Sequence, residues 1–156
     1  MASPPRRSPA AHGKPPRTAQ SERLLVRLRD ICLALPEATE KLSHGEPTWF
    51  AGGKGKVFAM FDDHHHGAAQ VSVWVPLPVG AQEALVASVP ARFFRPPYVG
   101  ASGWVGVRLT PRPDWGAVAG LVRDGFVQVA AQKLAARLIQ SRSAGPSKAS
   151  ARRRAP

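Results

Sequence analysis

The stretch RFFRPPYVGASGWVGVRL, residues 92–109, says most about the fold of this chain. Two adjacent prolines and a Gly-x-x-Gly segment are typical of a tight, irregular turn, and a strand pattern follows directly. The aliphatic residues Val105, Val107 and Leu109 alternate there with Trp104, Gly106 and Arg108. Because successive strand residues point to opposite faces, we expect the first set to face a core and the second to face outward.

Helical periodicity on both sides of this stretch predicts helices near the two ends of the folded unit. A first helix is expected over 19–35, where Pro36 ends it. Its apolar face is formed by Leu24, Leu28, Ile31, Cys32 and Leu35. A short helix is expected over 80–89, and a final helix begins at the capping residue Asp114. The segment KLAARLIQ, 133–140, extends that last helix or starts another.

Three strands are predicted between the first two helices. The apolar runs on either side of GGKGK, 52–56, form a hairpin, and AAQVSVWVPL, 68–77, forms the third strand. In that strand the valines 71, 73 and 75 face one way and Gln70, Ser72 and Trp74 face the other. Short hairpin links require antiparallel pairing. We therefore predict an α+β fold, with an antiparallel sheet of about four to six strands packed on one face by the N- and C-terminal helices.

The net charge of +12 is concentrated at the two ends of the chain. Residues 1–17 carry +4 and residues 140–156 carry +5, and neither segment contains an acidic residue. Both are rich in proline, serine and alanine, so we expect two disordered basic tails around a single domain spanning 18–139. The remaining +3 belongs to that domain. Cationic tails of this kind favour partners with phosphate backbones.

Four segments of the chain, taken together, resemble the MmcQ/YjbR family of small bacterial proteins. They are LPEATE (35–40), GEPTWFAGGKGKVFAMF (45–61), residues 92–109 quoted above, and DWGAVAGLVRDGFVQVAAQKLA (114–135). The resemblance implies a frataxin-like (CyaY-like) α+β fold and the label "DNA-binding" that the family carries. It supplies no catalytic residue. Where the family's final helix often reads Ser-Tyr, this chain has Gly125-Phe126.

Two short motifs invite a ligand-binding interpretation. GGKGK lacks the Ser or Thr that follows the lysine of a phosphate-binding loop, so a hairpin turn is favoured, with Lys54 and Lys56 able to touch phosphates from its tip. The run His64–His66 follows two aspartates. Adjacent residues on extended backbone diverge, so at most two of these histidines could share an ion, and a solvated loop is favoured.

Other classes of function have weaker support. The chain has no catalytic motif among its scattered carboxylates, so we expect a protein that is not an enzyme and needs no cofactor or metal.

Cys32 lies in the apolar stripe and is expected to be buried and inert. The N-terminus lacks the apolar segment of a secretory signal, and no apolar run is long enough to span a membrane, so we expect a cytoplasmic protein.

The outer face of the sheet is the main candidate site outside the tails. Trp74, Trp104 and Arg108 are expected there, and Arg92 and Arg95 precede the same strand. Aromatic side chains beside cations can stack bases and hold phosphates. The alternative is that a helix, a loop or a second subunit covers this face.

The leading hypothesis is weak, sequence-nonspecific DNA binding, in which the tail residues Arg152, Arg153 and Arg154 join the face residues in contacting phosphates. The second hypothesis is a protein-interaction module that docks a partner on the tryptophan-bearing face. The third is an enzyme or small-molecule binder without recognisable catalytic residues.

Overall fold

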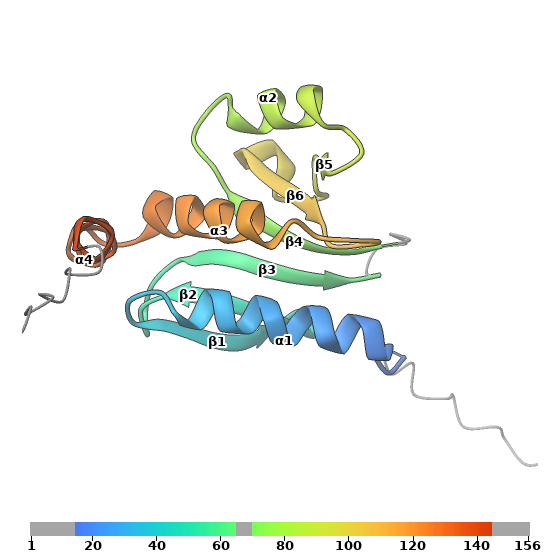
Figure 1. The fold of residues 1–156 in the computed structure, drawn as a ribbon, viewed down its shortest axis with the longest axis horizontal. Coiled ribbons are helices and arrows are strands. Elements are labelled where there is room, and N and C mark those ends of the chain that lie inside the picture. Colours follow the sequence, from blue (N-terminus) through green and yellow to red (C-terminus); the bar gives the residue numbers. More distant parts are fainter. Residues whose placement is uncertain (1–14, 65–69, 145–156) are drawn as a thin grey trace, which may run out of the picture.

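The computed structural model describes residues 15–64 and 70–144, which form one antiparallel sheet packed by helices (Figure 1). The helices are α1 (Ala19–Leu33), α2 (Ala81–Ser88), α3 (Trp115–Val129) and α4 (Gln132–Ser143), with a short 3₁₀ turn η2 (Gly100–Ser102). The strands are β1 (Ala38–Ser43), β2 (Glu46–Ala51), β3 (Val57–Asp63), β4 (Val71–Pro76), β5 (Phe93–Phe94) and β6 (Trp104–Arg108). They lie in the order β1-β2-β3-β4-β6-β5, which confirms the predicted α+β class.

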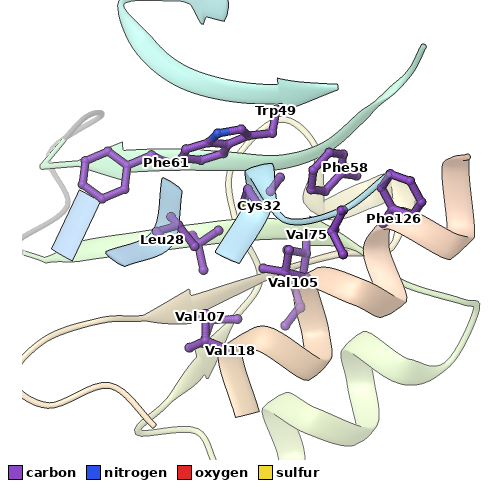
Figure 2. Close-up of a cluster of buried hydrophobic side chains, with 14 of the residues drawn as sticks. Leu28, Cys32, Trp49, Phe58, Phe61, Val75, Val105, Val107, Val118 and Phe126 are labelled. Carbon is purple, nitrogen blue, oxygen red and sulfur yellow. The ribbon is translucent and has the colours of Figure 1, made fainter. Parts of the chain in front are cut away.

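The core lies between the sheet and the helices α1 and α3, as the apolar stripes predicted (Figure 2). Leu28 and Cys32 of α1 are fully buried, as are Val122 and Phe126 of α3. The Phe126 ring meets Phe58 of β3 edge-on, with 5.2 Å between ring centroids. Val105 and Val107 of β6 are also buried, so the alternation that predicted their inward direction is confirmed.

Gly125 allows α3 to lie unusually close to the sheet. A Cβ at this position would come within 2.9 Å of the Phe58 carbonyl oxygen and 3.2 Å of Pro76 Cδ. Glycine costs helix propensity, so its place inside α3 needs a compensating reason. That reason is the close approach of α3 to β3 and β4.

A carboxylate on the first strand ties α1 to the sheet. Glu40 of β1 accepts two hydrogen bonds from the Arg29 guanidinium, at 2.8 and 2.9 Å, and a third from the indole Nε1 of buried Trp49 at 3.0 Å. The hydrogen bond to Glu40 raises the pKa of Arg29 above its usual value. A carboxylate next to an apolar core is stable only when it is paired with a positive charge and accepts several hydrogen bonds, and Glu40 meets both conditions.

The sequence prediction of three strands before α2 is wrong by one, because β1 is an additional strand at the sheet edge. Leu42 is its one large apolar residue and is exposed, and none of its residues is buried, so it carries no alternating apolar signal. It pairs with β2 through a two-residue turn at His44 and Gly45, with φ angles of 52° and 79°. Two positive φ values are characteristic of the hairpin turns that match the twist of a sheet.

The described residues include a few on either side of the predicted domain, 18–139. Arg17, assigned to the N-terminal tail, is only partly exposed and forms ion pairs with Glu46 and Asp63. Helix α4 continues to Ser143, inside the range assigned to the C-terminal tail. It is a separate helix from α3, since Ala130 and Ala131 between them have extended backbone. No helix in the described ranges has the length and apolar character needed to cross a bilayer.

Candidate functional site

The GGKGK segment forms the turn between β2 and β3, as the hairpin interpretation predicted. The Ala51 amide donates to the Lys56 carbonyl at 2.9 Å and the Gly55 amide donates to the Gly52 carbonyl at 3.2 Å. Gly52 has a φ of 91°, and a Cβ on Gly55 would lie 1.7 Å from the Ala51 carbonyl oxygen. The glycines therefore serve the turn, and Lys54 and Lys56 are both exposed at its tip.

A cleft of about 610 Å³ opens between α1, α3 and α4, and three arginines from the three helices line it. They are Arg27, Arg123 and Arg137, and Asp30 is the acidic residue beside them. Arg137 also pairs with Glu37 at 3.1 Å, with more than half of each side chain exposed. An exposed pair of this kind contributes about 0–1 kcal/mol, so Arg137 can exchange this partner for another anion.

The hairpin tip and the arginine cleft belong to the same end of the molecule. The Gly52 amide donates to the Glu37 carbonyl, and a Cβ on Gly52 would lie 3.7 Å from Leu134 of α4. In Figure 1 this is the end where α4 and the β2–β3 turn lie. We call the five residues Arg27, Lys54, Lys56, Arg123 and Arg137 the basic end. The chain leaves α4 here toward Arg152, Arg153 and Arg154, which lie outside the described residues.

Of the two alternatives for the outer face, a covered face describes Trp74. Its side chain is outside the core cluster formed with α1 and α3, but it is 5% exposed, and its indole Nε1 donates to Ser72 Oγ at 3.1 Å. Tyr98 and Val99, from the irregular segment between β5 and β6, lie in the wall of the same cavity. An indole buried to this degree offers little surface on which a base could stack.

Arg108 also lies on this outer face, but its donors are used within the fold. Its guanidinium stacks 4.8 Å from the centroid of the Phe94 ring. It donates to Gln70 Oε1 at 2.7 Å and to the carbonyls of Pro90 and Phe93 at 3.0 and 3.3 Å. Gly106 leaves the space for the Phe94 ring, since a Cβ there would lie 2.3 Å from it. Through these contacts the Arg108 side chain holds β5 against β6.

The remaining candidates from sequence do not converge on one surface. Arg92 pairs with Asp114, the N-cap of α3, at 3.4 Å. Arg95 is exposed and packs beside Gly100, whereas Trp104 is half-buried and its carbonyl accepts from Gln82. None of the three lies in the cleft that holds the helix arginines. The structure thus separates Lys54 and Lys56 from the residues predicted on the outer face.

The outer face instead contains a cavity of about 490 Å³ with an acidic lining. Glu46 and Asp62, each 4% exposed, contribute carboxylates, and Met60, Trp74 and Tyr98 contribute the apolar walls. The strand register accounts for this placement. Thr48 pairs with Met60, and Glu46 and Asp62 lie two residues beyond them on the same face. We call this the acidic cavity.

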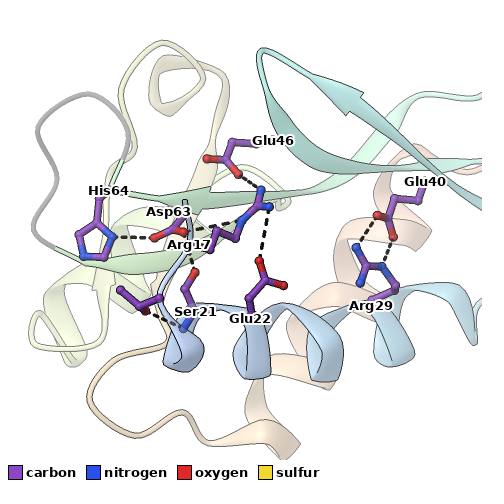
Figure 3. Close-up of polar contacts among 9 residues, drawn as sticks. Arg17, Ser21, Glu22, Arg29, Glu40, Glu46, Asp63 and His64 are labelled. Carbon is purple, nitrogen blue, oxygen red and sulfur yellow. Dashed lines mark hydrogen bonds and ion pairs between the residues drawn. The ribbon is translucent and has the colours of Figure 1, made fainter. Parts of the chain in front are cut away.

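The Arg17 guanidinium connects the acidic cavity to the start of α1 (Figure 3). It lies 2.9 Å from Glu46, 3.7 Å from Asp63 and 3.9 Å from Glu22. Asp63 also accepts a hydrogen bond from Ser21 Oγ at 2.7 Å and lies 2.6 Å from His64 Nδ1. One guanidinium thus lies within 4 Å of three carboxylates and ties the start of α1 to β2 and β3.

Two other groups named from sequence have structural explanations. Cys32 is fully buried, and burial followed by the charge of Glu40 raises the pKa of its thiol well above the usual value, as expected for an inert cysteine. His64 faces Asp63, whereas His65 and His66 lie outside the described residues. Within 15–64 and 70–144, no group of three metal-ligating side chains is gathered.

Sequence reasoning missed the acidic cavity because its residues come from distant segments. Tyr98 gave the one usable signal, since it lies between the prolines and the Gly-x-x-Gly of residues 92–109. Its backbone has a φ of 62°, and its side chain is 80% exposed. A bulky residue in the left-handed region is uncommon and costs free energy, and such residues gather at functional sites.

Comparisons with known proteins agree with this architecture. No curated protein matches the chain. Among solved structures, protein DR2400 of Deinococcus radiodurans is similar, with a TM-score of 0.56 and 17% sequence identity over 67% of this chain and 76% of that one. At this identity the likeness shows a shared fold. The YjbR family model matches residues 33–128, from the end of α1 almost to the end of α3. Because this match covers more than half of the sequence, the chain belongs to the YjbR family.

Proposed function

We propose that this protein is a non-enzymatic, cytoplasmic module that binds DNA weakly and without sequence preference. The observation that carries the proposal is the basic end, where one cleft is lined by arginines of α1, α3 and α4 and two exposed lysines lie on the β2–β3 turn, which approaches α4 at Gly52. Cations gathered on one surface can neutralise neighbouring phosphates, and the release of counterions from DNA then drives binding.

The charge of the C-terminal sequence supports the same proposal. The last described helix, α4, contributes Arg137 to the cleft, and the sequence after it adds Arg152, Arg153 and Arg154 without an acidic residue. These arginines would add phosphate contacts to those of the basic end. Arginine and lysine contacts to phosphates position a protein on the duplex but carry no sequence information.

The surfaces of α1 and α3 favour DNA binding that does not depend on sequence. The exposed face of α1 offers Arg23 and Arg27, and α3 offers Arg123, but neither helix presents a row of Arg, Asn and Gln suited to base edges in a major groove. Docking of a protein on the tryptophan-bearing face is the alternative. It has less support, because Trp74 is buried and Arg108 is engaged within the fold.

The experiment is a salt titration of the full chain binding to a fluorescent duplex, repeated with two double variants of equal charge change. Lys54→Gln/Lys56→Gln removes two exposed cations from the basic end. Arg95→Gln/Arg112→Gln is the matched control, since Arg95 precedes β6 and Arg112 precedes α3 at the end remote from α4. We expect log K to fall linearly with log salt, with about 0.9 in slope for each phosphate contact.

The two double variants should then behave differently. Loss of two contacts in the basic end lowers the slope by about 1.8, and the control keeps the slope of the unmodified protein. Binding that does not depend on salt would refute the proposal. Equal weakening by both double variants would show that net charge, and not the basic end, attracts the DNA.

A further inference from the structure

We infer that the cleft between α1, α3 and α4 is a binding site for a free nucleoside polyphosphate. Its volume of about 610 Å³ lies in the range of small-molecule sites. The inference goes beyond the DNA-binding proposal and does not rest on it, because a nucleotide in the cleft needs neither the lysines of the β2–β3 turn nor the C-terminal sequence. It is carried by the combination of arginine side chains and apolar side chains in one recess.

Arginines from three helices supply the phosphate-binding part of the cleft. Arg27 of α1, Arg123 of α3 and Arg137 of α4 line it together, and Asp30 is the one acidic residue in its described lining. Neither Arg27 nor Arg123 forms a hydrogen bond or an ion pair with any described residue. Their donors are therefore available to a ligand, whereas the donors of Arg108 are used within the fold.

The geometry of the guanidinium group favours phosphate as the anion. Its N–H groups form a planar fork that matches two oxygens of one phosphate. Arg137 pairs with Glu37 at 3.1 Å, and both side chains are more than half exposed, so a phosphate can replace this carboxylate at little cost. Because the three arginines come from separate helices, they suit a chain of linked phosphates better than a single ion.

The floor of the cleft favours a ligand that also has a planar apolar part. Leu35 and Leu138 line it and are each 6% exposed, and Ile31 lies four residues after Arg27 on the same side of α1. A purine base can lie against these aliphatic side chains while its phosphates reach the exposed arginines. Asp30 can accept hydrogen bonds from sugar hydroxyls, which an inorganic polyphosphate lacks. The cleft therefore fits a whole nucleotide better than a phosphate chain alone.

The test is an NMR titration of the ¹⁵N-labelled full chain with ATP in the absence of metal ions. A salt concentration of about 0.15 M reduces the Debye length to about 8 Å and so weakens contacts with exposed cations elsewhere on the chain. The controls are tripolyphosphate, which has no nucleoside, and adenosine, which has no phosphate. We expect ATP to give saturable shifts of the Ala119 and Ser141 amides, since both residues line the cleft.

The two controls should bind more weakly than ATP. Tripolyphosphate loses the apolar contacts with the floor and should bind at least about fivefold more weakly, and adenosine should give no saturable shift because it lacks the groups that the arginines bind. Equal affinities for ATP and tripolyphosphate would show that the cleft attracts any polyanion and would overturn the inference. Absence of a saturable shift with ATP would overturn it as well.

Two single variants of equal charge change locate the site. Arg123→Gln removes a cleft arginine and should weaken ATP binding roughly tenfold, whereas Arg112→Gln lies outside the lining and should leave the affinity unchanged. Both side chains are exposed, so both variants keep the fold. Equal ATP affinities of the two variants would contradict the inference.

The DNA titration gives a separate answer, because its double variant changes Lys54 and Lys56, which lie outside the cleft lining. A chain that binds the duplex with the expected salt slope but shows no saturable shift with ATP would refute the nucleotide site alone. A chain that binds ATP in the cleft but does not bind the duplex would support the nucleotide site and refute the DNA-binding proposal.

Discussion

Two glycines of the same helix should respond in opposite ways to the same substitution. Gly120 and Gly125 both lie inside α3, and replacing either with alanine adds one methyl group and removes backbone freedom from the unfolded chain. On helix propensity alone, each change should stabilise the protein by about 1 kcal/mol. The difference between them comes from what the added methyl group meets.

At Gly125 the methyl group meets the backbone of the sheet. It would lie 2.9 Å from the Phe58 carbonyl oxygen and 3.3 Å from the Pro76 carbonyl oxygen, and neither atom can turn away as a side chain could. Helix α3 must therefore move outward, which loosens the packing of buried Phe126 beside it. Overpacking of a core costs about 1–3 kcal/mol. After subtraction of the propensity gain, we expect Gly125→Ala to destabilise the protein, by up to about 2 kcal/mol.

At Gly120 the methyl group meets nothing within 4 Å, and the residue is exposed. The propensity gain is then unopposed, so Gly120→Ala should stabilise the protein by about 0.5–1 kcal/mol. Urea unfolding measures both changes, and thermal melting should show shifts of about 4 °C per kcal/mol, downward for Gly125→Ala and upward for Gly120→Ala. Two shifts of the same sign would refute the argument that close approach to the sheet requires Gly125.

Three further predictions concern the core. Glu40→Ala should lower the free energy of unfolding by about 1–3 kcal/mol in urea titrations, because the buried Trp49 indole N–H loses its acceptor; an unchanged midpoint would contradict this. Val107→Asp should abolish the cooperative thermal transition, because Val107 is 1% exposed, whereas Val79→Asp at a fully exposed site should melt normally. The raised pKa of Cys32 means that the folded protein favours the neutral thiol. The contribution of this thiol to the free energy of unfolding is therefore fully present below the pKa of about 8.5 in the unfolded chain, and it is lost as the pH rises through the pKa in the folded protein. Cys32→Ala should flatten this alkaline decline in stability, and the native thiol should not react with a thiol reagent at pH 8.

The sequence by itself determined the elements whose signals are local. The 3–4 residue spacing of Leu24, Leu28 and Cys32 predicted α1 and its buried face, because neighbours on a helix share one side. The alternation around Val107 predicted the direction of every β6 side chain. The glycines of GGKGK predicted a turn, because few other residues adopt the backbone that it needs. These patterns depend on residues close together in the chain.

The tertiary structure decided what covers each surface and which charges meet. Trp74 has the sequence pattern of an outward-facing residue, yet it is 5% exposed and shares a cavity wall with Tyr98 and Val99 of a distant segment. Helix spacing places Arg27 on the outer side of α1, but its neighbours Arg123 and Arg137 come from helices that follow much later in the chain. A periodic pattern fixes the direction of a side chain relative to its own element. Burial and electrostatic partners depend on how elements pack together, and that information is distributed over the whole fold.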